Sequence, residues 1–176
     1  MIIIVCAKLP SSIILPQQDL SLSIIPLNSS WQTHGLLMSA LLFGPHIGTI
    51  CAISYLILGL FYLPVFHGGG SVGYILTHEF GYLLGFIPAA WICGFLSKRK
   101  TNANLINYSF YTILSLCIIH FSGIIYLVLG KLIGNWTENL SDLILINTLL
   151  AFPTQLLLCL PISLISIVLK RTLILK

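Results

Sequence analysis

The chain carries no Asp, Glu, Lys or Arg from Leu20 to His78. A helix that crosses the hydrocarbon core of a bilayer needs about 20 predominantly apolar residues, so this stretch is long enough for two spans and a loop. Charged residues make up 7% of the whole chain, whereas soluble domains carry roughly 25%. The sequence therefore predicts an integral membrane protein, and its length predicts a single transmembrane domain over residues 1–176.

Five uncharged apolar segments predict transmembrane helices, which are expected over residues 33–43, 46–63, 80–97, 105–130 and 143–169. The Gly44-Pro45 pair separates the first two of these helices, because proline cannot continue a helix through its interior. Pro88 lies inside the third helix and is expected to kink it for the same reason.

The N-terminal apolar segment, residues 2–15, is less regular because it contains Lys8 and Pro10. We expect it to form the first helix of an all-α, polytopic bundle of six transmembrane helices, as a weak or broken helix. No basic region precedes its apolar residues, so a cleaved secretory signal is not expected.

The basic residues predict which face of the membrane each loop occupies. Short loops rich in Lys and Arg remain on the cytoplasmic side. With the N-terminus inside, six spans place Lys98-Arg99-Lys100 and Lys170-Arg171 in the cytoplasm, and residues 62–79 then face outward. The basic residues are few and flank apolar runs, so nucleic acid is not an expected partner.

The outward segment holds three adjacent glycines, Gly68, Gly69 and Gly70, between two apolar segments. Adjacent glycines lose much backbone entropy and bury no side chain, so a helix or strand is an unfavourable place for them. They suit a loop whose main chain bends sharply or approaches another group closely. Phe66 and Tyr74 flank this loop, and the combination predicts a ligand-capping loop at a membrane face.

The candidate ligand site combines this loop with polar and aromatic residues at the ends of neighbouring helices. Amide side chains and backbone N–H groups beside aromatic walls suit a neutral polar ring with an apolar tail. Aromatic residues at the ends of spans are also typical of a membrane-interface belt, so both interpretations stay open. The expected binding residues are Trp31, Gln32, Phe66, Gly68, Gly69, Gly70, Tyr74, Gly81, Tyr82 and Gln155.

Catalysis and metal binding have weaker support in the sequence. The chain has no P-loop motif, so it is not expected to hydrolyse a nucleotide. Gly69-x-Ser71-x-Gly73 matches the G-x-S-x-G pattern, but a nucleophile elbow needs a strand before the serine and a helix after it. His67 and His78 could share a metal ion, yet no further ligands occur at a recognised spacing. We therefore expect a non-enzyme without metal or cofactor, with a hydrolase acting through Ser71 as an alternative.

Other histidines and the cysteines are expected to be structural. His34 and His120 lie in or beside apolar segments and are expected to make ordinary helix contacts. The five cysteines are far apart and lie within apolar runs. We expect them to pack as small apolar residues, without disulfides or metal.

Several segments of the chain are similar to the BioY family. They are W-Q-T at 31–33, L-L-F-G-P at 41–45, Y-L-I-L-G-L-F-Y-L-P-V-F at 55–66, G-G-G-S-V-G-Y-I-L at 68–76, F-G-Y-L-L-G-F-I-P-A-A at 80–90 and, more loosely, F-P-T-Q-L at 152–156. The resemblance implies the six-helix fold of a biotin-binding S component of an energy-coupling-factor (ECF) transporter. It also implies that biotin is held near the outer face, as the transported ligand.

The same resemblance implies the partners and the location of the chain. An S component works in the lipid bilayer with a transmembrane coupling subunit and two cytosolic ATPase subunits. The residues of the glycine segment are similar to those of cyanobacterial members, and the amino-acid composition suits a plastid genome. The expected location is therefore a bacterial plasma membrane or a plastid inner membrane. Where the family often has P-G-D-L-x-K, this chain has Gln155 for the acid and Leu158 for the lysine. A non-catalytic structural or assembly subunit of a membrane complex is the alternative.

Overall fold

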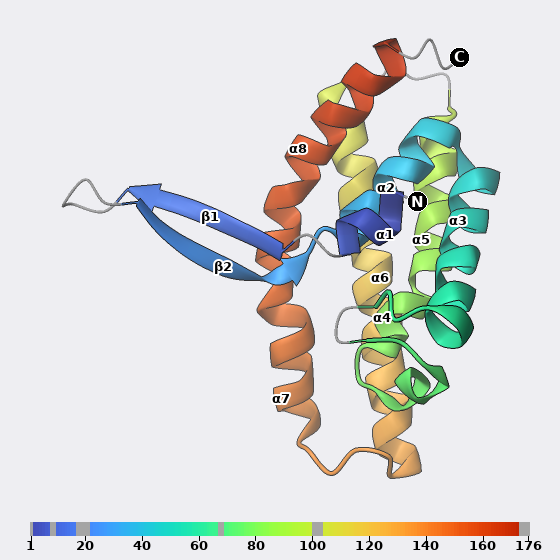
Figure 1. Cartoon of the computed structure of the whole chain (residues 1–176), viewed down its shortest axis with the longest axis vertical. Helices are drawn as coiled ribbons and strands as arrows, with labels where there is room; N and C mark the ends of the chain where they lie inside the picture. The colour runs from blue at the N-terminus through green and yellow to red at the C-terminus, as the bar shows by residue number, and fades with distance from the viewer. Residues whose placement is uncertain (1, 8–9, 17–21, 67–68, 100–103, 173–176) are drawn as a thin grey trace.

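The computed structural model describes residues 2–7, 10–16, 22–66, 69–99 and 104–172. Most of these residues form helices that pack side by side into an elongated bundle (Figure 1). Within the described part of the chain, four helical stretches are long and apolar enough to cross a membrane. They are Pro45–Tyr62, Phe80–Ser97, Leu105–Ile133 and Leu140–Thr172.

The first two helices of the bundle are joined by the predicted Gly-Pro break. Helix α2 spans Gln32–Phe43, and α3 spans Pro45–Ile57 and continues as the short π-helix η1 over Leu58–Tyr62. Gly44 between them has φ +88°, a value that favours glycine. Pro45 takes the first position of α3, where its missing N–H group costs nothing.

The remaining spans also match the predicted segments. The third predicted segment forms α4 (Phe80–Leu84) followed by α5 (Phe86–Ser97), and the fourth forms α6 (Leu105–Ile133). The last is α7 (Leu140–Ile144), the π-helix η3 (Leu145–Leu149) and α8 (Ala151–Thr172).

The predicted kink in the third span occurs at Gly85, between α4 and α5. Pro88 follows within one turn and has no N–H group to donate to the carbonyl of Leu84. The hydrogen bond from Ala89 N to Gly85 O, 3.1 Å long, resumes the helical ladder beyond the kink.

The N-terminal segment begins with α1 (Ile2–Ala7), whose six residues are too few to cross a membrane. The expectation of a first transmembrane helix over residues 2–15 was therefore wrong beyond Ala7, because Pro10–Pro16 is a strand. A β-hairpin that was not predicted then follows, with β1 over Pro10–Pro16 and β2 over Leu22–Ser30. Prolines at the ends of β1 and within β2 oppose a continuous helix, and runs of Ile and Leu favour strands. The hairpin extends sideways from the bundle, with β2 against α8 (Figure 1).

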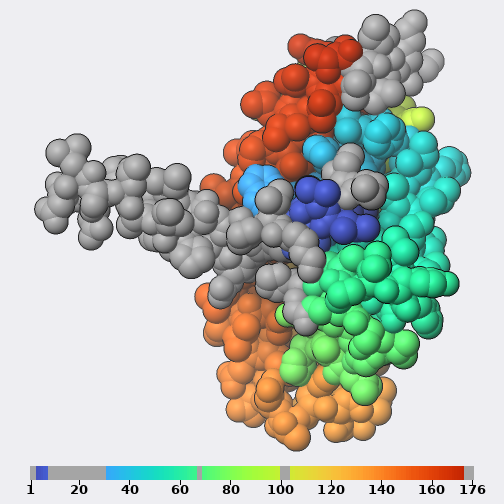
Figure 2. All heavy atoms as spheres, in the orientation of Figure 1, coloured from blue at the N-terminus to red at the C-terminus, as the bar shows by residue number. Residues whose placement is uncertain are grey.

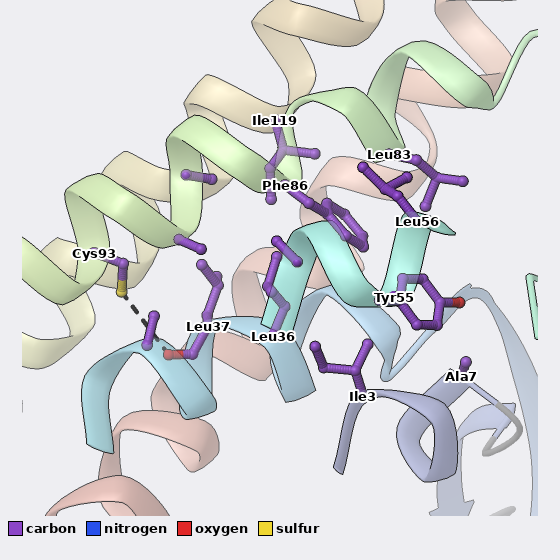
Figure 3. Packing of buried hydrophobic residues seen from close by; sticks show 14 of the residues in the cluster. Ile3, Ala7, Leu36, Leu37, Tyr55, Leu56, Leu83, Phe86, Cys93 and Ile119 are labelled. Carbon is purple, nitrogen blue, oxygen red and sulfur yellow. Dashed lines mark hydrogen bonds between the residues drawn. The ribbon is translucent and has the colours of Figure 1, made fainter. Parts of the chain in front are cut away.

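Helix α2 lies at the centre of the core. Leu36, Leu37 and Leu41 have no exposed surface, and Figure 3 shows Leu36 and Leu37 facing the side chains of neighbouring helices. The thiol of Cys93 in α5 approaches the carbonyl of Leu37 at 4.0 Å. As expected, the cysteines are unbridged, and Cys93 packs as a small apolar residue.

The two ends of the bundle differ in charge. At the end where α8 finishes, Lys170 Nζ donates to the hydroxyl of Tyr108 at 2.9 Å. At the opposite end lie the glycine segment and the connection between α6 and α7, which carries Glu138 (Figure 1). This separation agrees with the predicted distribution of basic and acidic loops.

Candidate ligand site

The loop after η1 is anchored by an aromatic cluster. Phe66 is buried, and its ring centroid lies 5.4 Å from that of Tyr55 and 4.8 Å from that of Tyr74. The Tyr55 hydroxyl donates to the carbonyl of Val65 at 2.9 Å. Two of the predicted site residues, Phe66 and Tyr74, are therefore in contact.

The glycines of this loop allow its main chain to come very close to the end of η1. A Cβ atom on Gly70 would lie 2.6 Å from the carbonyl oxygen of Gly59 and 2.8 Å from that of Leu63. Gly69 has φ +129°, which disfavours any side chain although the surrounding space is open. The expected close approach is thus confirmed at Gly70, whereas Gly68 lies outside the described residues.

The short 3-10 helix η2 (Val72–Leu76) follows the glycines and is fastened to the α6 end of the bundle. The hydroxyl of Tyr126 donates to the carbonyl of Ile75, and the hydroxyl of Tyr74 donates to the carboxylate of Glu79. His78 lies 3.5 Å from the carboxylate of Glu138, at the centre of the α6–α7 connection. In Figure 2 these green and orange segments form one continuous end of the molecule.

Gly81 and Tyr82 lie on α4, where that helix crosses α6 closely. A Cβ atom on Gly81 would come within 2.2 Å of Tyr126, and one on Gly123 would come within 2.4 Å of the Tyr82 ring. The Tyr82 hydroxyl lies 2.7 Å from the hydroxyl of Thr148 in η3. Gly81 therefore serves close packing, and Tyr82 bridges α4, α6 and the last span.

Gln32 is the first residue of α2, and the half-buried Trp31 precedes it as the N-cap residue. Gln32 is buried, and the ring of Trp31 meets the ring of His34 edge-on at 6.3 Å between centroids. Trp31 thereby adjoins a buried polar cluster that the sequence did not predict.

This cluster consists of His34 in α2, His120 in α6 and Gln155 in α8. His34 Nε2 lies 2.8 Å from the backbone carbonyl of Gln155, and His120 Nε2 lies 3.0 Å from the side-chain oxygen Oε1 of Gln155. The rings of Tyr82 and Phe152 meet His120 edge-on at 5.6 and 5.1 Å. Gln155 is half-buried, while both histidines are buried.

These contacts determine which imidazole nitrogen carries the hydrogen. A carbonyl oxygen only accepts, so Nε2 of His34 and Nε2 of His120 donate to Gln155. In a neutral ring Nδ1 is then an acceptor, and neither Nδ1 has a partner among the described residues. An unpaired buried polar atom costs about 1–3 kcal/mol, and such costs concentrate at sites that meet a ligand or water.

The predicted site residues thus fall into two groups. Phe66, Gly69, Gly70 and Tyr74 form the loop group. Trp31, Tyr82 and Gln155 gather around the two histidines. Gly81 belongs to neither group and packs against Tyr126, and Gln32 is buried at the start of α2.

The interpretation of His34 and His120 as ordinary helix contacts was incomplete, because each donates one hydrogen bond to Gln155 and leaves its Nδ1 without a partner among the described residues. A signal was available in the sequence. An ionisable side chain inside a transmembrane segment points to a functional site, and its partner should be sought on a neighbouring helix.

A separate hollow of about 460 Å³ lies between α1, α2 and α3. Its walls are mainly aliphatic, with Ile3, Ile47 and Ile50 among them, and Ser39 and Ser54 are its small polar side chains. Gln155 and the two histidines do not line it. It is therefore separate from the Gln155 group, whereas Tyr55, which lines it, contacts Phe66 of the loop group.

The two chemical alternatives gain no structural support in the described part of the chain. Ser71 is exposed and precedes a 3-10 helix of five residues, so it lacks the strand-to-helix turn of a nucleophile elbow. His78 faces Trp136 and Glu138, and no group of three potential metal ligands occurs among the described residues. His67 lies outside them.

The chain is similar to known proteins over most of its length. The family model described as BioY matches residues 1–174. A solved structure, the S-component for biotin from an ECF-type ABC transporter, superimposes with a TM-score of 0.74 at 25% identity. The superposition covers 96% of this chain and 85% of that one.

Curated relatives match shorter segments. A probable biotin transporter BioY from Lysinibacillus sphaericus is 33% identical over 51% of this chain and 46% of its own length. The biotin transporter BioY from Rhizobium etli is 33% identical over 47% of this chain and 45% of its own. These matches span about half the length of each relative. The biotin transporter BioY from Lactococcus lactis is 29% identical over 71% of this chain and 69% of its own length. Because the family model matches residues 1–174 and the fold superimposes on that of an S-component, this chain is a member of the BioY family.

Proposed function

We propose that this protein is the biotin-binding S component of an ECF-type vitamin transporter. It captures biotin at the end of the bundle that carries the glycine loop and delivers it inward, with energy from partner ATPases. The observation that carries this proposal is the superposition of 96% of the chain on an S-component for biotin. Membership of the BioY family supports the same ligand.

The two groups of predicted residues supply what biotin requires. The cyclic urea of biotin is a neutral polar ring, and its thiophane ring and valeryl chain are apolar. Gln155 and its two histidines offer hydrogen-bonding groups beside the rings of Trp31 and Tyr82. Phe66 and Gly70 pack against η1, and the absence of a side chain at Gly70 permits this close approach. We infer that this segment covers the bound ligand. We include Gln32, Gly68 and Gly81 with this site because of their places in the sequence.

In such a transporter, ligand binding and ATP hydrolysis are carried out by different subunits. The chain lies in a membrane with several spans, as one transmembrane domain. It hydrolyses no substrate itself and needs no cofactor. A transmembrane coupling subunit and two cytosolic ATPases use ATP, in a bacterial plasma membrane or a plastid inner membrane.

Binding of radiolabelled biotin to the purified protein in detergent tests the proposal. We expect saturable binding by the parent protein and much weaker binding by Gly69→Val, because a β-branched residue is disfavoured at φ +129°. Gly73→Ala is the matched control, since a Cβ atom there meets only Ser71 Oγ at 3.4 Å.

Uptake of labelled biotin by cells that express the chain, with and without a coupling module, tests delivery. Absence of binding by a folded, monodisperse parent protein would contradict the proposal and would favour a purely structural subunit.

A further inference from the structure

Gln155 is held at two points by histidines from two other helices. His34 in α2 donates to its backbone carbonyl, and His120 in α6 donates to its side-chain oxygen, at 2.8 and 3.0 Å. Here the position of the main chain and the orientation of the carboxamide are both constrained.

The orientation decides which group of Gln155 remains available. Because Oε1 accepts from His120, the carboxamide nitrogen Nε2 is the free end, with two N–H donors. No described residue accepts from it, and Gln155 is half-buried, unlike the fully enclosed histidines. The cluster therefore presents hydrogen-bond donors beside the rings of Tyr82 and Phe152, which contact His120.

We propose that Gln155 recognises the urea carbonyl of the ligand through its carboxamide N–H groups, and that His34 and His120 are positioning residues that impose this donor orientation. The inference rests on the proposed function, since it names the group of biotin that the protein recognises and the residues that orient Gln155 toward it. It assigns specificity to two histidines that the sequence marked only as helix contacts.

The chemistry predicts a preference between two closely related ligands. Biotin offers a carbonyl oxygen, which accepts from Gln155. In 2-iminobiotin a nitrogen replaces that oxygen and, at neutral pH, the resulting guanidinium offers hydrogens at the same place. Two donors would then face each other, so the site should favour biotin strongly over 2-iminobiotin.

The experiment measures the dissociation constants of both ligands for each variant in detergent at neutral pH. Gln155→Glu has nearly the same shape but only acceptors, so the ratio of the constants should shift toward 2-iminobiotin by about tenfold or more. His120→Phe keeps an aromatic ring and removes the donor, which lets the carboxamide turn, and the ratio should move in the same direction.

Two further variants separate positioning from packing. His120→Gln restores a donor and should return the ratio toward that of the parent protein, while Thr154→Ser, one residue from Gln155, should leave it unchanged. A loss of packing would weaken both ligands equally and would leave the ratio constant. An unchanged ratio in Gln155→Glu and His120→Phe therefore overturns the inference.

The parent protein alone provides a second test, which is independent of whether any variant folds. Equal affinity for biotin and 2-iminobiotin would overturn the inference while leaving the proposed function intact. Failure of the parent protein to bind biotin would instead contradict the proposed function.

Discussion

The ring of Phe66 lies directly against Gly59, where a Cβ atom would come within 2.1 Å of the Phe66 Cζ atom. Gly59 belongs to η1, so the loop that follows this π-helix folds back onto it. Tyr55 and Tyr74 hold the Phe66 ring from two sides, with centroid distances of 5.4 and 4.8 Å. Gly59 therefore leaves the space that the Phe66 ring occupies, and the two tyrosines hold the ring there.

Gly59→Val should displace the Phe66 ring and weaken biotin binding by roughly ten- to hundredfold, since overpacking costs about 1–3 kcal/mol. Titration of the detergent-solubilised variant with labelled biotin measures the effect. Gly73→Ala, in the neighbouring helix η2, adds a Cβ atom that meets only Ser71 Oγ at 3.4 Å and should bind like the parent. Normal binding by Gly59→Val would mean that the docked ring is not needed for capture.

Gly94→Ala should destabilise the bundle by about 1–3 kcal/mol. The added atom would lie 2.5 Å from the backbone of Gly44 and Pro45, which cannot move aside as a side chain can. Thermal unfolding in detergent would report the change. Cys117→Ala, at an exposed position of α6, serves as the control, and equal stability of the two variants would contradict the close approach.

The hydroxyls of Tyr82 and Thr148, 2.7 Å apart, should be coupled by about 1 kcal/mol. A double-mutant cycle with Tyr82→Phe and Thr148→Val measures this energy from unfolding data. A second cycle that pairs Tyr82→Phe with Thr154→Val should give no coupling, since Thr154 donates to Ala151 instead. Equal coupling in the two cycles would argue against a direct bond.

Tyr74 should make the stability of the protein fall at alkaline pH. Burial, together with its hydrogen bond to Glu79, raises the pKa of the Tyr74 phenol above its usual 10.0. Above that pH the unfolded chain loses the proton while the folded protein keeps it, so the stabilisation is complete below pH 10.0 and declines as the pH rises.

Tyr74→Phe should therefore show a shallower loss of stability between roughly pH 9 and 11 than the parent protein. Thermal unfolding across this range would reveal the difference. Tyr62→Phe, at an exposed tyrosine, is the matched control and should keep the slope of the parent. Parallel curves for the parent and Tyr74→Phe would refute the assignment.

The positions of the spans could be predicted because they depend on local properties. A long uncharged run is sufficient to identify a helix in a membrane. Gly44-Pro45 separates two helices, and a helix break lies at Gly85, one turn before Pro88. The glycine loop was also predictable, since adjacent glycines are unfavourable in regular structure. The hairpin over β1 and β2 was missed because an apolar segment with prolines resembles a broken helix as closely as it resembles strands.

Sequence by itself determined that this chain is a helical membrane protein, where most of its helices run, and where its glycine loop lies. Only the tertiary structure decided that His34 and His120 converge on Gln155. His34 and Gln155 are separated by 121 residues along the chain, so no local pattern could bring them together. Helix formation depends on apolar length and on nearby Gly and Pro. The meeting of these three side chains depends on the rotation and spacing of α2, α6 and α8, which only the packing of the whole bundle sets.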